Sequence, residues 1–247
     1  MSVKVHPLPA MPLLVDPPPW NAQPPAGAGE PLGRSVLGNA LLLYGARPAN
    51  LLVIAGVHGD ESEAIFLAHL LLASGCPAPL VPCMNPDGAL LRQRWNRNNV
   101  DLNRNLPTPD WQAEALHPRY PPGRAPGSEP ETAAFLAALA RVRPATVLSL
   151  HSYKESFIEI ERPERELSPS LNAAVADYAE AAGIGRRASI GYPTPGALGS
   201  FGRTERLLVL TYELERGRPH GELQALVEPL LRLVARLDAE RFVPPAP

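Results

Sequence analysis

The sequence predicts an α/β fold with a mixed, mostly parallel β-sheet and helices on both of its faces. Stretches typical of strands alternate with stretches typical of helices along most of the chain, an order that favours strand–helix–strand units. The 247 residues are 45% hydrophobic, which is enough to bury a sizeable core, and this length is compatible with one large domain.

The first clear pair of elements begins with the apolar run LLVIA at residues 51–55, which predicts a buried strand. A helix is expected at residues 62–73, because apolar side chains recur there at helical spacing. Two more apolar runs predict strands at residues 145–150 and 207–214. The other predicted elements are strands at 40–44, 80–84 and 157–160 and helices at 131–140, 171–182 and 222–240.

Prolines indicate how the chain is divided. The chain has 31 prolines, a share well above the usual value of about 5%, and nine of them precede residue 32. Residues 1–32 are therefore expected to form an extended or partly disordered N-terminal extension, residues 33–242 the folded domain, and residues 243–247 a tail. A second cluster predicts a long ordered loop at residues 106–130, and such loops are usually functional.

Charge and hydropathy exclude several classes of partner. The formal charge is −2 and the pI is about 6.3, so nothing in the charge balance favours binding to nucleic acid or to an anionic membrane. No apolar stretch has the length of a membrane span, and the N-terminus has no export signal, which favours the cytoplasm. The oligomeric state has no signature in the sequence.

Metal-binding residue types follow two of the predicted strands. His58 and Glu61 lie in HGDE, on the turn after the strand at residues 51–55, and His151 ends the strand at residues 145–150. A histidine three residues before a glutamate would occur by chance in roughly one such chain in three. The main support for a metal site is therefore the second strand, which ends in His151. Glu114 and His117 have similar spacing, but no strand supports them.

A hydrolytic zinc site needs three nitrogen or oxygen ligands, and His58, Glu61 and His151 supply that number for one ion. It also needs a carboxylate that takes a proton from water without binding the metal. Glu213, in the strand sequence TYELE, is the candidate, and Glu215 lies one pleat further along the same face as its rival.

The polar segment NPDGALLRQRWNRNNVDLNRN, residues 85–105, adds two further motifs to this pattern. HGDE, NPDG, the run R-x-N-x-x-N-V-D-L-N-R-N, LHSY and TYEL resemble, in this order and spacing, the zinc carboxypeptidase family of metallopeptidases. The segments PGSEPET and GYPTPGALGSFG resemble its murein tripeptide amidase branch. The resemblance covers roughly residues 33–215.

The resemblance implies a role for each matching position. It assigns the zinc ligands to His58, Glu61 and His151 and the general base to Glu213. Arg94 would stabilise the oxyanion, with Arg92 and Arg97 as alternatives. Asn103 and Arg104 would bind the terminal carboxylate of the substrate, and Tyr192 would close over it; a tyrosine that packs on proline at the rim is the alternative.

Two segments depart from the family pattern. Asn99 stands where the family has glycine, which predicts a positive φ angle, a conformation that asparagine tolerates better than most residues. The segment KESFIEIERP, which follows LHSY, has no match in the amidase branch.

The function implied is zinc-dependent hydrolysis of an amide bond next to a terminal carboxylate. Within the amidase branch that bond joins γ-D-glutamate to meso-diaminopimelate in murein tripeptides, which are small peptides cleaved during cell-wall recycling. The alternatives are an ordinary metallocarboxypeptidase acting on short peptides, a deacylase similar to aspartoacylase or succinylglutamate desuccinylase, and a non-catalytic binding module.

Overall fold

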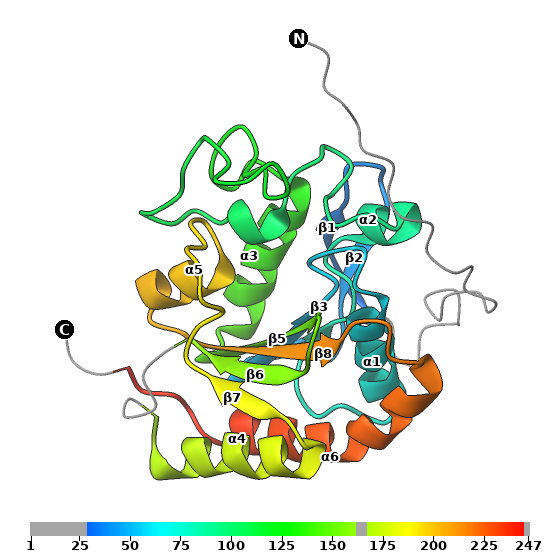
Figure 1. The fold of residues 1–247 in the computed structure, drawn as a ribbon, viewed down its shortest axis with the longest axis vertical. Helices are drawn as coiled ribbons and strands as arrows, with labels where there is room; N and C mark the ends of the chain where they lie inside the picture. Colours follow the sequence, from blue (N-terminus) through cyan, green and yellow to red (C-terminus); the bar gives the residue numbers. More distant parts are fainter. Residues whose placement is uncertain (1–28, 162–166, 245–247) are drawn as a thin grey trace.

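The computed structural model describes residues 29–161 and 167–244, so the predicted N-terminal extension lies almost entirely outside the described residues. The core of the fold is a six-stranded sheet with the order β4–β3–β5–β8–β6–β7 (Figure 1). Its strands are β3 (Leu51–Ala55), β4 (Leu80–Val81), β5 (Thr146–Tyr153), β6 (Phe157–Ile160), β7 (Gly185–Arg187) and β8 (Leu208–Glu215). All neighbouring strands are parallel except β6 and β8, which confirms the mixed, mostly parallel sheet.

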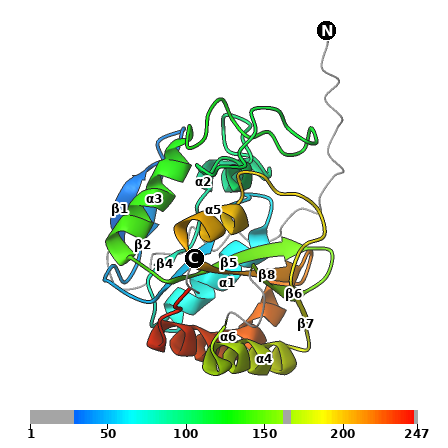
Figure 2. The same cartoon turned by 90° about the vertical axis from the view of Figure 1, so that its left-hand side faces the viewer.

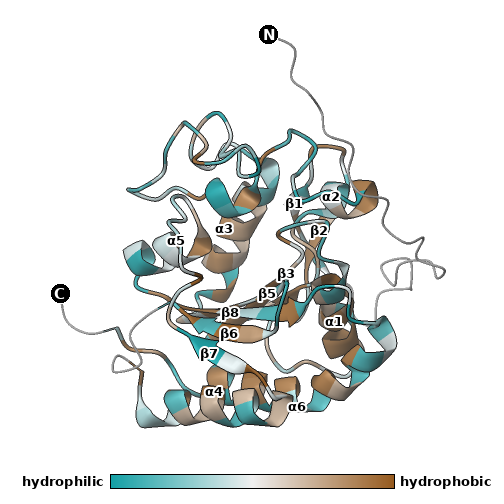
Figure 3. Ribbon diagram, viewed as in Figure 1, coloured by the Kyte–Doolittle hydropathy of each residue, from teal (hydrophilic) through white to brown (hydrophobic). Residues whose placement is uncertain are grey.

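Helices cover both faces of this sheet (Figures 1 and 2). Helices α1 (Ser62–Ala73), α4 (Pro169–Ala182) and α6 (His220–Ala239) pack on one face, and α3 (Pro130–Val142) and α5 (Leu198–Glu205) on the other. Alternate residues of β3 enter the two cores: Leu51 and Val53 face the first group of helices, and Leu52 and Ile54 face the second. This explains the uninterrupted apolar run, which Figure 3 shows as brown central strands.

A small antiparallel pair, β1 (Glu30–Arg34) and β2 (Ala40–Leu43), lies beside α3. Strand β1 begins three residues before the expected start of the folded domain at residue 33. Four other elements were not predicted: β7, α5, α2 (Pro86–Leu91) and the short 3₁₀ helix Leu102–Arg104.

Strand β5 runs three residues past its predicted end at residue 150, and β8 runs one residue past its predicted end at residue 214. Their parallel ladder continues through His151↔Glu213 to Tyr153↔Glu215, so His151 lies within β5 rather than just beyond it, and Glu213 lies within β8 as predicted. Backbone hydrogen bonds between β5 and β8 keep the polar ends of both strands extended. The strand predicted at 80–84 is shorter, ending at Val81.

The proline-rich segment contains neither helix nor strand from residue 106 to residue 129, as expected, and α3 then begins at Pro130. In Figure 1 this segment forms the green loops above the sheet. Among the described helices, none combines the length and the apolar character that crossing a membrane requires.

Candidate metal centre and its pocket

Three side chains from two adjacent strands converge at the edge of the sheet. His58 and Glu61 lie on the turn between β3 and α1, and His151 lies on β5, the parallel neighbour of β3. One candidate ligand atom from each residue lies within 4.8 Å of the others, and each residue is only 3% exposed. Among residues 29–161 and 167–244, no other group of three or more His, Cys, Asp or Glu side chains has this geometry.

The HGDE turn is tight because it packs against the backbone of α2. A Cβ atom on Gly59 would lie 2.0 Å from the carbonyl carbon of Gly88, so no other residue fits at this position without moving the helix. The Gly59 N–H also donates to the carbonyl oxygen of Arg94 at 3.3 Å. This contact fixes the turn that carries two of the three candidate ligands.

The two histidine rings are held with equivalent nitrogens turned inward. The Nδ1 atoms of His58 and His151 lie 2.8 Å and 2.9 Å from the two carboxylate oxygens of Glu61. Their Nε2 atoms contact other groups: Asp101 Oδ1 at 3.2 Å for His58, and Ser149 Oγ at 2.9 Å for His151. Each ring therefore has an outer partner that sets its orientation and leaves Nδ1 for an ion.

Asp101 is a site residue to which the sequence assigned no role. It is fully buried and contacts both His58 and the Nε–H of Arg94, which donates to Oδ2 at 2.9 Å. Burial alone would raise its pKa, but Arg94 and His58 more than offset this effect and hold the pKa well below the usual range. Asp101 is therefore a permanent anion that joins the metal cluster to Arg94.

The cluster fits a zinc ion. Two imidazole nitrogens and one carboxylate oxygen are the donor set of hydrolytic zinc sites, in which a fourth position stays open to water. The three residues line a pocket with a volume of about 260 Å³, which gives that fourth position access to substrate.

Glu213 lines the same pocket beside His151, its register partner in β5. It is 7% exposed, and its buried Oε2 atom has no hydrogen-bond partner among the described residues. Burial, together with the nearby carboxylates of Glu61 and Glu159, raises its pKa to about 7, against the opposing effect of His151. Glu215 is exposed at the end of β8 and does not line the pocket.

Of the three candidate arginines, only Arg94 reaches the metal cluster. Its side chain is 13% exposed and lines the pocket, with NH1 3.9 Å from Glu61 Oε1. Burial would lower its pKa, but Asp101 and Glu61 raise it above the usual value, so Arg94 stays charged. Arg92 and Arg97 are exposed and do not line the pocket.

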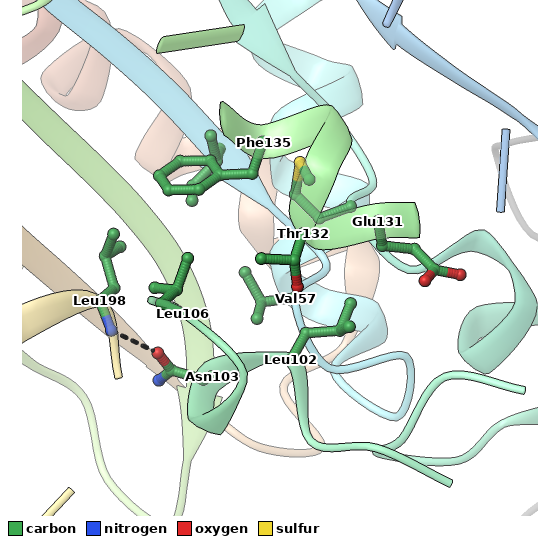
Figure 4. A pocket seen from close by; sticks show the side chains of 10 residues that line it. Val57, Leu102, Asn103, Leu106, Glu131, Thr132, Phe135 and Leu198 are labelled. Carbon is green, nitrogen blue, oxygen red and sulfur yellow. Dashed lines mark hydrogen bonds between the residues drawn. The ribbon is translucent and has the colours of Figure 1, made fainter. Parts of the chain in front are cut away.

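Asn103 and Arg104 lie side by side on the 3₁₀ turn Leu102–Arg104, and both line the pocket. The Leu198 N–H donates to Asn103 Oδ1 at 2.8 Å, so the amide is held by the start of α5 (Figure 4). Behind it, apolar side chains including Leu106 and Phe135 surround a cavity of only about 30 Å³. The 3₁₀ turn that carries Asn103 and Arg104 therefore packs directly on the hydrophobic core.

Tyr192 stands at the rim with 38% of its surface exposed, and its ring stacks on Tyr120 with centroids 6.3 Å apart. Tyr120, from the proline-rich segment, also lies under two guanidinium groups, with its ring centroid 5.1 Å from Arg94 Cζ and 4.8 Å from Arg104 Cζ. Burial and the contact with Tyr120 raise the pKa of Tyr192 to about 12. The proline-rich segment thus supplies an aromatic wall of the pocket.

The sequence analysis also assigned no role to four polar residues that line the pocket: Tyr120, Glu159, Glu161 and Arg216. Arg216 donates to Asp60 Oδ2 at 2.9 Å and lies 3.5 Å from Glu61 Oε1. Glu159 and Glu161 come from the unmatched segment after LHSY. Their alternation with Ile158 and Ile160 was a usable signal, because alternate strand residues share one face.

Comparisons with known proteins agree with this geometry. The family model described as zinc carboxypeptidase matches residues 72–194. Murein peptide amidase A of Escherichia coli K12 is 36% identical over 203 residues, which cover 74% of this chain and 80% of the relative. Murein peptide amidase A of Vibrio campbellii is 30% identical over 206 residues, covering 74% and 77%.

Solved structures give the same result. The crystal structure of murein-tripeptide amidase from Escherichia coli O157 superposes with a TM-score of 0.71 at 32% identity, covering 85% of this chain and 94% of that one. Carboxypeptidase A from Helicoverpa armigera has a TM-score of 0.68 at 19% identity, covering 86% and 68%, which shows a shared fold. The chain therefore belongs to the zinc carboxypeptidase family of metallopeptidases, and zinc is its cofactor.

Proposed function

We propose that this protein is a zinc-dependent amidase that releases a C-terminal amino acid from murein peptides by hydrolysing the bond between γ-D-glutamate and meso-diaminopimelate. The observation that carries the proposal is that one pocket combines the three-ligand cluster, the buried carboxylate of Glu213, and Arg94 and Arg104. The 36% identity to a protein named murein peptide amidase A supports the substrate class.

A zinc ion held by His58, Glu61 and His151 supplies the Lewis acid of this chemistry: it makes water more acidic and polarises the amide carbonyl. Glu213 accepts the proton of the attacking water, for which its unpartnered Oε2 atom and a pKa of about 7 suit it. The water oxygen bonds to the carbonyl carbon, the C–N bond breaks, and Glu213 returns the proton to the departing nitrogen.

Arg94 stabilises the negative charge that develops on the carbonyl oxygen, because it is the buried cation nearest to the cluster and Asp101 fixes its position. Arg104 and the Nδ2 group of Asn103 bind the carboxylate of the leaving residue, with Tyr192 closing the rim. A free carboxylate one residue beyond the cleaved bond is therefore the recognition element.

The roles of the individual site residues, the γ-linkage and the cytoplasmic location stay predictions. The γ-linkage is tested by incubating zinc-loaded enzyme with γ-D-glutamyl and α-L-glutamyl peptides that carry the same C-terminal residue. The proposal expects faster release from the γ-linked peptide. Preferential cleavage of the α-linked peptide would instead indicate an ordinary metallocarboxypeptidase. Cell fractionation tests the location.

A further inference from the structure

Arg216 lines the pocket and has no part in the mechanism above. It is the first residue after β8, and its backbone N–H donates to the carbonyl oxygen of Tyr153, the last residue of β5, at 2.6 Å. The side chain is 38% exposed, so a ligand in the pocket can reach it. A permanent cation therefore stands at the carboxyl end of the β5–β8 ladder.

Three contacts fix the guanidinium group of Arg216. NH1 donates to Asp60 Oδ2 at 2.9 Å, and NH2 donates to the Ser152 carbonyl oxygen at 3.3 Å and to Glu61 Oε1 at 3.5 Å. A guanidinium group has five N–H donors, and these contacts use at most three of them. The group is therefore held beside a candidate metal ligand and keeps donors for a further acceptor.

The leaving residue of the substrate belongs at the other end of the pocket. Asn103, in the proposed carboxylate anchor, accepts a hydrogen bond from Leu198 N–H at the start of α5. A Cβ atom on the next residue, Gly199, would lie 2.3 Å from Glu161 Oε2, so this carboxylate packs on the helix backbone. The Glu161 N–H in turn donates to the Val209 carbonyl oxygen at 3.0 Å. The anchor is therefore connected to the Val209 end of β8.

Glu213 lies between this end of β8 and Arg216. Each residue of a strand advances the chain by about 3.3 Å, so Val209 and Arg216 lie well apart on opposite sides of the proposed base. With its carboxylate on the anchor, the leaving residue extends from Glu213 toward Val209. The acyl residue, which carries the attacked carbonyl, then extends toward Arg216.

We propose that Arg216 binds a free carboxylate on the acyl residue of the substrate and thereby selects a γ-linked glutamate. The inference rests on the proposed function for the direction of the substrate. A γ-linked glutamate keeps its α-carboxylate, separated from the attacked carbonyl by three carbon atoms, whereas a residue of an ordinary α-linked chain has no free α-carboxylate there. The donors of Arg216 that Asp60 does not occupy form charge-assisted hydrogen bonds with this group.

The test compares three substrates that release the same residue, meso-diaminopimelate. The acyl groups are N-acetyl-γ-D-glutamyl, N-acetyl-γ-D-isoglutaminyl, in which a neutral amide replaces the carboxylate, and 4-acetamidobutyryl, in which hydrogen replaces it. Hydrogen bonds to charged groups predict that kcat/KM of the wild type is roughly tenfold to a hundredfold higher for the glutamyl substrate. Arg216→Gln should lose most of this preference, and Arg216→Lys, which keeps the charge, should retain part of it.

Zinc content is measured for every variant, because Arg216 also contacts Glu61. If Arg216 only supported the metal site, Arg216→Gln would lower kcat/KM by the same factor for all three substrates, and this result would refute the inference. Arg47→Gln is the matched control: Arg47 also pairs with an aspartate, Asp238, its side chain is 47% exposed, and it lies outside the pocket. This variant should keep the wild-type preference.

Binding of the acyl products to the zinc-loaded enzyme, measured by calorimetry, gives a readout independent of turnover. The wild type should bind N-acetyl-D-glutamate more tightly than N-acetyl-D-isoglutamine, and Arg216→Gln should not. If γ-linked substrates are cleaved but neither rate nor binding distinguishes the carboxylate from the amide, the inference is refuted and the proposed function stands. If no γ-linked substrate is cleaved, the proposed function fails, and the binding comparison alone decides whether Arg216 binds a carboxylate.

Discussion

Replacing Asp101 by asparagine should weaken zinc binding although Asp101 is not a ligand. The change removes the charge that faces His58 Nε2 at 3.2 Å and Arg94 Nε at 2.9 Å. If the new amide turns its oxygen toward one of these partners, its NH₂ group faces the other, so the network cannot be fully satisfied. Loss of an outer-shell partner typically lowers metal affinity by about 10-fold to 100-fold.

Stability should fall as well. Arg94 is only 13% exposed, and leaving one member of a buried ion pair without its partner costs about 3–5 kcal/mol. Zinc affinity is measured by competition with a chromophoric chelator, and stability by urea unfolding of the zinc-loaded protein. The two measurements separate the effect on the metal from the effect on the fold.

Asp238→Asn is the matched control. Asp238 also pairs with an arginine, Arg47, and accepts backbone hydrogen bonds, including one from Leu51, but it lies at the opposite end of β3. This variant should lose stability and keep wild-type zinc affinity. If Asp101→Asn bound zinc as tightly as the wild type, the contact between Asp101 and His58 would not contribute to zinc affinity, and the prediction would be wrong.

Four further predictions follow from the same site. Glu213→Gln should keep zinc and lose activity by at least about 100-fold, because the amide cannot accept the proton of water; near-normal kcat would move the base elsewhere. His58→Ala, Glu61→Ala and His151→Ala should each lower the zinc content measured by mass spectrometry, whereas His117→Ala should not, since His117 lies outside the cluster; full zinc retention in His151→Ala would contradict the ligand set. Arg104→Met should lower kcat/KM for the free acid by a factor that corresponds to a loss of about 2–5 kcal/mol in transition-state stabilisation, and much less for an amide-capped substrate; equal losses on both would show that Arg104 does not bind a carboxylate. Glu161→Gln should raise the unfolding temperature at pH 8 but not at pH 4.5. Burial raises the folded-state pKa of Glu161 to about 7, above the usual 4.5 of an exposed glutamate, so ionisation destabilises the fold as pH rises through this window, by up to about 3 kcal/mol; an equal change at both pH values would refute the assignment.

Local patterns in the sequence predicted the elements whose apolar residues alone determine their structure. Helix α1 occupies the predicted residues 62–73, and β6 the predicted residues 157–160, because each buries a regular apolar pattern. Asn99 has φ of +59°, as the replacement of a glycine suggested. The three metal-ligand candidates could be predicted because parallel neighbours in a sheet bring their carboxyl ends to one edge.

The missed elements depend on tertiary contacts. Helix α5, LGSFGRTE, contains two glycines and has weak intrinsic helix preference. Those glycines are needed where the helix meets other groups: Gly199 packs on Glu161, and a Cβ atom on Gly202 would lie 2.4 Å from a methyl carbon of Val209. Strand β7, with the sequence GRR, has no apolar pattern and forms through its backbone pairing with β6.

The missed site residues depend on register and on distant contacts. Asp101 is 43 positions from His58, and nothing local predicts their contact. Glu159 belonged to a recognisable strand and Glu161 follows its last residue, but only the antiparallel pairing of that strand with β8 shows that Glu159 shares the face of Glu213. Tyr120 reaches Arg94 and Arg104 from a segment without helix or strand, whose path has no periodic signal.

The most direct test of the account is the release of free meso-diaminopimelate from L-Ala-γ-D-Glu-meso-diaminopimelate, followed by mass spectrometry. The zinc-loaded enzyme should release it, chelation should stop the release until zinc is restored, and Glu213→Gln should stop it with zinc still bound. Release that continues at the wild-type rate in the zinc-loaded Glu213→Gln variant, or absence of release by the zinc-loaded wild type, would contradict the account.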